Sequence, residues 1–453
     1  MPDSDGNGED SHPTRRRYLT LLGAGGAAGL AGCTGSRNKN QQSLNDPIEL
    51  YTWNLPFLKK SINGWMKDYK EEYGDKYENL QTKWTDRGPA TEDILSYFQS
   101  RLQSGNPPNV FDTQMTTFTR YAEKGESGIW APLGQFTDDQ FLNKYYDRLI
   151  KVNTVNGQLL NMPFYMGTNA TFSRRKWFDE AGIDPPTVGN YPSTMEYLDM
   201  AENLVNNSGA EFGLTFIRFD WQIWPWFLAE GINVVNDKGT EVVFNKPRTK
   251  EILSRFRELT QNGVIPEVSW TGDWKPAAQQ FGAGNTAMYF GSGSALRLIQ
   301  NSGDWVSPDA MAVGGAPSGK RYGALMTMHG LGVVKVDNSD VAQRAAFDLI
   351  KVILNKKWQK DFLRNTTVLV PHKQAVKELQ NDEQFQNKNP SLVKMYKLWD
   401  DVSDRVWVPP LVTASSEMAQ IVDTQFSAAA LGEKPVDAAV KQAEQQCNQA
   451  LQG

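Results

Sequence analysis

Short apolar runs alternate with amphipathic stretches along most of the chain. Residues 48–53 (IELYTW) and 109–112 (NVFD) are apolar enough to be buried strands. Between them, apolar side chains recur every three or four residues from about Ser61 and again over 91–105, which predicts two helices, the second ending at Gly105. This alternation is typical of α/β layers in which helices cover a largely parallel sheet.

The alternation continues towards the C-terminus. Ser193 and Glu196 have the spacing of a capping box and predict the start of a helix. Two further helices are expected over about 247–263 and 341–364, and two strands over 286–290 and 331–336. The pattern contains no internal repeat, so solenoid and propeller architectures are not indicated.

Length and charge limit the classes of protein to which the chain can belong. A chain of 453 residues exceeds the usual size of one hydrophobic core, so two cores are expected. The chain is 40% hydrophobic and contains 14 Trp. This composition is typical of a globular protein that buries apolar surface. The 47 basic and 52 acidic residues give a net charge of −5, which provides no basic surface, and we expect no nucleic-acid partner.

The chain has only two cysteines, Cys33 and Cys447. Their number and wide separation make a structural disulfide framework implausible. Val436, Val440 and Cys447 recur at helical spacing after Pro435, so Cys447 falls on an apolar helix face. We expect it to be a buried, inert thiol.

The N-terminus resembles an export signal in three parts. The paired arginines that precede Tyr18 resemble a twin-arginine signal, and the apolar run 18–32 is shorter than the ~20 residues of a membrane-spanning helix. Residues 30–33 (LAGC) resemble a lipobox, whose cysteine becomes lipidated. We expect residues 1–33 to be the export signal, 34–46 a polar tether, and Cys33 the lipid attachment site that holds the protein on the outer face of the cell membrane.

Five short phrases occur in a set order along the chain. They are LQSGNPPNVF at 102–111, WAPL at 130–133, MPFY at 162–165, FDEAGI at 178–183 and FGAGNTAM at 281–288. In this order they resemble the maltodextrin-type family of extracellular solute-binding proteins of ABC importers, in which the second phrase is a surface turn and the third a strand that crosses between lobes. The fifth, F-x-x-G-x-x-A-M, is the most specific. The chain departs from the family at Phe172 and Ser173, where Tyr-Asn is common.

The resemblance implies an α/β fold of the two-lobed, class II periplasmic-binding-protein type. It places lobe 1 at 47–165 and 324–368 and lobe 2 at 166–323 and 369–453, joined by hinge crossovers. The implied function is the capture of a small solute, a mono- or oligosaccharide, by lobe closure, and its delivery to the permease of an ABC importer. We expect a monomer without cofactor or metal.

Polar and aromatic residues at strand ends are the first candidates for ligand contact. A sugar has an apolar face and a rim of hydroxyls, so its site needs flat aromatics together with amides or carboxylates. Trp53 and Asn54 follow the first predicted strand, and Asp86 and Gln114 occupy comparable positions after later strands. The alternatives stay open: Trp53 packs at the lobe edge, and the polar residues are merely solvated.

An aromatic segment at 219–226 (FDWQIWPW) provides another candidate. The resemblance places Trp221 at a ligand-stacking position and leaves Trp224 and Trp226 to the core. The alternative for Trp221 is packing, because aromatic clusters are more often core than site. Under the ligand-contact interpretation, Trp221→Ala costs affinity and leaves the stability of the unliganded protein almost unchanged.

Gly291, Ser292 and Ser294 precede a predicted helix, where backbone N–H groups can point at ligand oxygens. The alternative is an ordinary serine N-cap. Maltodextrin binders stack an aromatic ring near the position of Ser294, and its absence here argues against a long glucan. The resemblance adds three contacts from hinge and cleft segments, Tyr165, His329 and Trp407.

The competing class is a secreted carbohydrate-active enzyme of the glycoside hydrolase type, because two opposed carboxylates suffice for that chemistry. Sequence spacing leaves this geometry open. The chain has no G-x-S-x-G or GxxxxGK[ST] motif, and His329 and His372 are the only histidines after the export signal. An adhesion or structural lipoprotein would show repeats or all-β patterning. We therefore expect a binding protein, not an enzyme.

Overall fold

A computed structural model describes residues 42–52, 58–86, 91–115, 118, 128–219, 221–335, 339–366, 368–410 and 412–452. Cys33, most of the predicted tether, Trp53 and Asn54 lie outside the described residues, so the expectations for them stay predictions. The same holds for the side chain of Asp86. Among the helices of these ranges, none is both long and apolar enough to cross a membrane.

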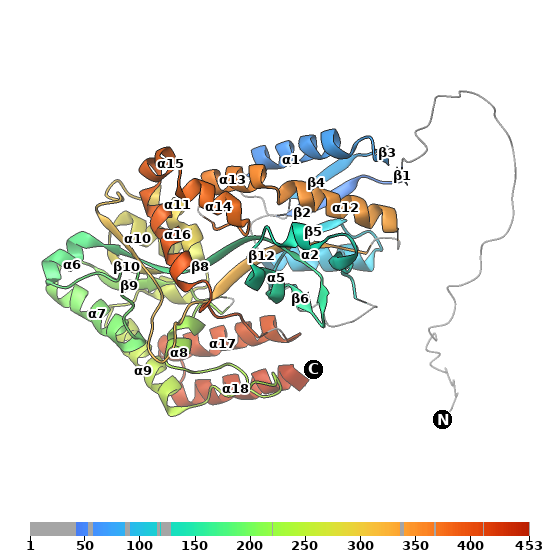
Figure 1. Cartoon of the computed structure of the whole chain (residues 1–453). Helices are drawn as coiled ribbons and strands as arrows, with labels where there is room; N and C mark the ends of the chain where they lie inside the picture. Colours follow the sequence, from blue (N-terminus) through green and yellow to red (C-terminus); the bar gives the residue numbers. More distant parts are fainter. Residues whose placement is uncertain are drawn as a thin grey trace, which may run out of the picture. The chain divides into compact units, whose positions relative to one another are not determined.

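The centre of the fold is an eight-stranded sheet with the order β4-β2-β5-β12-β8-β10-β9, to which β11 adds by pairing with β8. Figure 1 shows its two ends under different sets of helices. The strands are β2 (Ile48–Thr52), β4 (Thr82–Asp86), β5 (Val110–Gln114), β8 (Met162–Arg174), β9 (Phe212–Phe216), β10 (Thr286–Ser292), β11 (Met311–Gly314) and β12 (Met326–Val333). Two small pairs lie outside it, β1 (Gln42–Ser43) with β3 (Tyr77–Glu78) and β6 (Thr154–Val155) with β7 (Gln158–Leu159).

Strand β8 divides the sheet into two halves. Its residues up to Thr168 pair with β12, and those from Asn169 onwards pair with β10 and β11. We call β4, β2, β5, β12 and the start of β8 the first half, and the end of β8 with β9, β10 and β11 the second half. In the first half β2 runs parallel to both β4 and β5, whereas β12 is antiparallel to its neighbours.

Helices cover the first half because its strands are apolar on both faces. Leu50 and Val110 belong to the main core, and the alternate residues Tyr51 and Phe111 form a second aromatic core. Helix α12 contacts β2, β5 and β12, and α1 packs on α12. The helices around this half are α1 (Leu58–Tyr73), α2 (Thr91–Gln103), α4 (Asp139–Leu142), α5 (Asp147–Val152), α12 (Asp340–Ile353), α13 (Lys356–Asn365) and α14 (Lys373–Gln380).

The second half is covered by helices of the middle and end of the chain. Helices α7 and α10 contact β9 and β10, and α9, α17 and α18 pack together. The remaining helices are α6 (Arg175–Ala181), α7 (Thr194–Asn207), α8 (Trp224–Ala229), α9 (Pro247–Gln261), α10 (Trp274–Ala283), α11 (Leu296–Gln300), α15 (Glu383–Lys388), α16 (Pro390–Val402), α17 (Ser415–Ala430) and α18 (Val436–Gln452). Short 3₁₀ turns occur at Leu133–Gln135, Glu267–Trp270 and Gly293–Ala295.

Local signals in the sequence predicted several element ends. The capping box at the start of α7 is confirmed, with Ser193 and Glu196 each bonding the backbone N–H of the other. Cys447 is confirmed on the buried face of α18, where burial raises the pKa of its thiol to about 12. At that pKa the thiol is protonated and inert.

The sheet is mixed and not largely parallel as predicted, because β12 is antiparallel to β5 and β8, and β8 is antiparallel to β10 and β11. Two predictions about elements are also wrong. The continuous helix expected over 341–364 is two helices, α12 and α13, because the Asn355 side chain accepts a hydrogen bond from the Trp358 N–H and starts a new helix. The phrase at 130–133 is not at the surface: Trp130 is 2% exposed, and its ring packs where Gly332 has no side chain.

Candidate ligand-binding site

The parallel strands of the first half end at one edge of the sheet. Thr52 pairs in register with Asp86, and the register between β2 and β5 places Thr52 level with Asp112. Because the carboxyl ends of parallel strands meet at a common edge, the predicted positions at the ends of β2, β4 and β5 come together there. The structure thus brings Asp86 and Gln114 to the edge from which the chain continues into Trp53.

Asp112 is the buried charge of this edge. Its carboxylate is fully buried, accepts a hydrogen bond from Thr52 Oγ1 at 2.7 Å and lies 2.9 Å from His329 Nδ1. A buried carboxylate costs several kcal/mol unless it is paired, so this arrangement holds both partners in place. An ionised Asp112 orients the imidazole with its Nδ1–H towards the carboxylate.

Tyr165 and His329 form a flat aromatic pair next to Asp112. His329 is paired in register with Gln114 on one side and with Tyr165 on the other. The Tyr165 and His329 rings stack with centroids 4.3 Å apart and planes 13° apart. Tyr165 is 8% exposed and the His329 side chain 12% exposed. Three of the predicted ligand residues therefore lie in one row across three strands.

In the second half, the Gly291–Ser294 segment lies beside a buried amide network. Ser292 pairs in register with Asn169 of β8. The Asn169 amide donates to Gln222 Oε1 at 2.8 Å and accepts from the Leu325 N–H at 2.7 Å. Asn169 and Gln222 were not predicted from the sequence, where their only signal is a polar residue within an apolar run.

The Gly291–Ser294 segment has the geometry of an ordinary serine cap. Ser292 Oγ accepts from the Ser294 N–H at 3.3 Å and from its hydroxyl at 3.0 Å. Gly291 is buried, and a Cβ there would lie 2.6 Å from Tyr289 Oη. Ser294 is exposed. The N–H of Ser294 is thus already satisfied by Ser292, and ligand contact by this segment stays a prediction.

Trp221 lies in the interior of the second half. It is 0% exposed, its ring contacts those of Trp224 and Trp407, and its indole N–H donates to Ser415 Oγ at 3.3 Å. Trp224 and Trp226 are also 0% exposed, which confirms their assignment to the core. The burial of Trp221 matches the packing alternative. A ligand-stacking role for it would require this cluster to open.

Backbone hydrogen bonds tie two further segments to β8 and β12 close to Gly167, where β8 passes from one half into the other. Met166 and Leu369 exchange two backbone hydrogen bonds of 2.9 Å, and the backbone of Trp407 bonds to Ala324 and Met326 at 2.6 and 2.7 Å. Gly167 lies between them on β8, where a Cβ would come within 2.8 Å of the Thr327 and Ser292 hydroxyls. The predicted contact Trp407 thus supports the junction through its backbone.

Solved structures share this architecture. The maltose-bound MalE3 of T. maritima has a TM-score of 0.72 and 16% identity, and the match covers 88% of this chain and 98% of that one. The substrate-binding protein Lmo0181 of Listeria monocytogenes, in complex with cycloalternan, has a TM-score of 0.73 and 19% identity over 90% and 99% of the two chains. UgpB of Mycobacterium tuberculosis, in complex with glycerophosphocholine, has a TM-score of 0.73 and 16% identity over 90% and 99%.

These similarities confirm the predicted α/β, two-lobed periplasmic-binding-protein fold. No curated protein sequence matches the chain. The family model of the bacterial extracellular solute-binding proteins matches residues 59–360, which span both halves of the sheet. The chain therefore belongs to the bacterial extracellular solute-binding protein family.

Proposed function

We propose that the protein is an extracytoplasmic receptor that captures a mono- or oligosaccharide and delivers it to the permease of an ABC importer. The observation that carries this proposal is the stacked pair of Tyr165 and His329 beside Asp112, at the edge where the parallel strands end. An aromatic face next to carboxylate and amide groups is the chemistry that a sugar requires. Two of the similar proteins, bound to maltose and to cycloalternan, support the carbohydrate class.

Capture would proceed by closure of the two lobes around the junction at Gly167. Strand β8 runs from one half into the other at Gly167, where a residue without a side chain suits a hinge that absorbs the motion. Closure would bring the Gly291–Ser294 segment of the second half towards the stacked pair of the first. The ligand would then be held between both lobes.

The protein is proposed to bind its ligand without converting it. A glycoside hydrolase needs two opposed carboxylates that are free for proton transfer or attack. The described carboxylate of the site, Asp112, is already bound by Thr52 and His329. Membership in a family of solute-binding proteins also supports binding over hydrolysis.

A thermal-shift screen tests the ligand class. The full chain carrying Cys33→Ser is melted with monosaccharides, maltose, larger oligosaccharides, amino acids, peptides and glycerophosphocholine. A carbohydrate at about 100 times its Kd should stabilise the fold by about 2.7 kcal/mol, because it binds the native state and not the unfolded chain. The sugar should be recovered intact. Stabilisation by amino acids, peptides or glycerophosphocholine alone would reassign the ligand, and release of shortened sugars would make the protein an enzyme.

We also propose that Cys33 is lipidated and anchors a monomeric receptor to the outer face of the cell membrane. The support is the lipobox-like LAGC sequence, followed by a polar tether. Cys33→Ser should move the protein from the membrane fraction to the soluble fraction. Membrane retention of the unmodified variant would contradict the anchor.

A further inference from the structure

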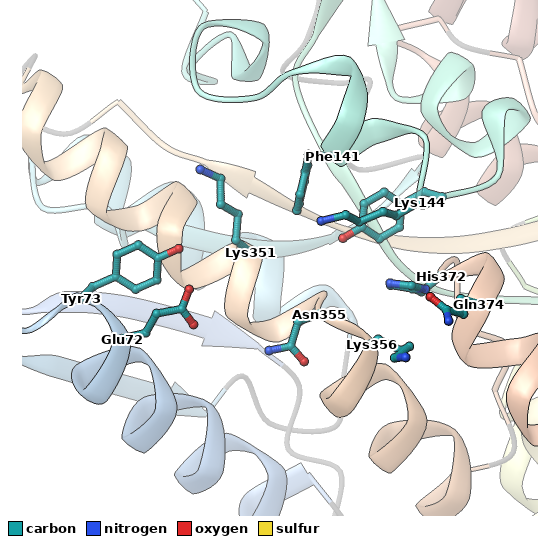
Figure 2. Close-up of a pocket in the computed structure, with 10 residues that line it drawn as sticks. Glu72, Tyr73, Phe141, Lys144, Lys351, Asn355, Lys356, His372 and Gln374 are labelled. Carbon is teal, nitrogen blue, oxygen red and sulfur yellow. The ribbon is translucent and has the colours of Figure 1, made fainter.

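A hollow of about 380 Å³ opens on the first half and shares no lining residue with the candidate ligand-binding site. Figure 2 shows side chains from α1, the segment around α4, the α12–α13 junction and the start of α14 surrounding it. Three aromatic residues and three lysines dominate its lining: Tyr73, Phe141, Tyr145, Lys144, Lys351 and Lys356. The hollow is therefore apolar on part of its wall and cationic on the rest.

The lysines leave positive charge in excess of the nearby carboxylates. Asp348 is shared by Lys351 at 3.1 Å and by Lys76 at 2.6 Å, so one carboxylate serves two ammonium groups. Lys144 forms no ion pair with any residue in the described ranges, and its ammonium lies 5.2 Å from the Phe141 ring centroid. Glu72 adds one negative charge to the lining.

A second carboxylate near the hollow, that of Glu378, is also shared by two lysines. Glu378 accepts hydrogen bonds from Lys356 at 2.8 Å and from Lys360 at 2.7 Å, and these two ammonium groups lower its pKa to about 2. One carboxylate again neutralises only one of two cations. Around the hollow the surplus is positive, although the whole chain carries a net charge of −5.

The uncharged polar groups of the lining are also donors. His372 Nδ1 accepts from the Ala375 N–H at 3.4 Å, which places the proton of the neutral ring on Nε2. Burial and the charges of Lys144 and Lys356 lower the pKa of His372 to about 4, so the ring is neutral at pH 7. Asn355 uses its oxygen to cap α13 and keeps its NH₂ group as a donor.

We propose that this hollow binds a small organic anion, with a carboxylate or phosphate held by Lys144, Lys351 and Lys356 and an apolar part against Phe141 and Tyr145. A carboxylate or phosphate only accepts hydrogen bonds, which suits a lining composed mainly of donors. The volume is within the range of small-molecule pockets. A protein partner would need about 800 Å² of contact surface on each side, far more than such a hollow offers.

The three histidines of the full chain, His12, His329 and His372, provide the readout. The chain is labelled with ¹³C-histidine, and His372→Asn and His329→Asn assign the resonances. It is titrated with phenyl phosphate, phenylacetate and the neutral benzyl alcohol. An anion that binds should shift the His372 signal and raise its pKa, because negative charge favours the imidazolium. The His329 signal should not move, which separates this hollow from the sugar site.

Two variants make the test specific. Lys144→Met removes an exposed cation of the lining and should weaken binding at least about fivefold. Lys373→Met is the matched control, because Lys373 is a neighbouring lysine that pairs with Asp147 at 2.8 Å and does not line the hollow. A response to phenyl phosphate alone or to phenylacetate alone identifies the anionic group. The proposal is overturned if neither anion shifts His372, if benzyl alcohol shifts it equally, or if both variants weaken binding alike.

Discussion

The two halves of the sheet hold their candidate residues in opposite ways. In the first half, Asp112 and His329 meet at a strand edge, and the His329 side chain keeps 12% of its surface exposed. In the second half, Trp221 is enclosed by Trp224, Trp407 and Ser415, and none of its surface is exposed. The difference shows that the predicted ligand contacts fall at a partly exposed strand edge in one half and in a packed interior in the other.

The backbone of Trp221 adds to this contrast. Its φ is 71°, a left-handed conformation that large side chains adopt only when their surroundings enforce it. The indole hydrogen bond and the two neighbouring rings are such surroundings. The second half therefore holds a strained backbone conformation at a packed residue. Ligand contact by Trp221 would require these surroundings to move.

The largest expected effect comes from removing this residue. Trp221→Ala should lower the free energy of unfolding by about 3 to 5 kcal/mol, because it empties a fully buried position. Urea denaturation of the unliganded protein measures this. Trp274→Ala, at a partly exposed tryptophan of α10, is the matched control and should cost much less. Unchanged stability with at least about tenfold weaker sugar binding would restore Trp221 to the ligand site.

The first half should contribute a pH dependence through His372, since no histidine lies in the described residues of the second half. His372 titrates near 4 in the folded chain and near 6.5 when unfolded. Between these values the unfolded chain binds the extra proton, so the stability that neutral His372 contributes is fully present above pH 6.5 and is lost as the pH falls towards 4. His372→Asn keeps a capping oxygen for α14 but cannot titrate, and it should flatten the slope. An equally steep slope in this variant would contradict the assignment.

The junction between the halves should tolerate no side chain at Gly167. Gly167→Ala places a methyl group 2.7 Å from Thr327 Oγ1 and 2.8 Å from Ser292 Oγ, and should cost about 1 to 3 kcal/mol. Adding Ser292→Ala should recover part of the loss. Gly134→Ala is the control, because nothing lies within 4 Å of its added methyl group. Equal costs at the two glycines, measured by denaturation, would show that the junction is not tightly packed.

The sequence predicted the layers of the fold because they rest on local signals. Apolar runs, capping residues and Pro435 predicted helices and strands. The ends of the predicted strands placed Asp86 and Gln114 at the sheet edge. The break at Asn355 was missed, since an asparagine inside a periodic apolar pattern does not by itself interrupt a helix.

The polar centre of the site was beyond sequence reasoning. Asp112 is bound by residues that lie 60 and 217 positions away in the chain, and no local pattern encodes such pairing. The burial of Trp221 was beyond sequence reasoning for the related reason that it depends on Trp407 and Ser415, far along the chain. The lysine-lined hollow likewise joins four separate segments.

The most direct test of the account is the affinity of the sugar that stabilises the protein most, measured by calorimetry for the parent, His329→Asn and His372→Asn. Asn at 329 can still donate to Asp112, but it removes the ring that stacks on Tyr165. We expect about tenfold weaker binding for His329→Asn, roughly 1.4 kcal/mol, and parent affinity for His372→Asn. Parent affinity in His329→Asn would contradict the placement of the ligand at the edge of the first half.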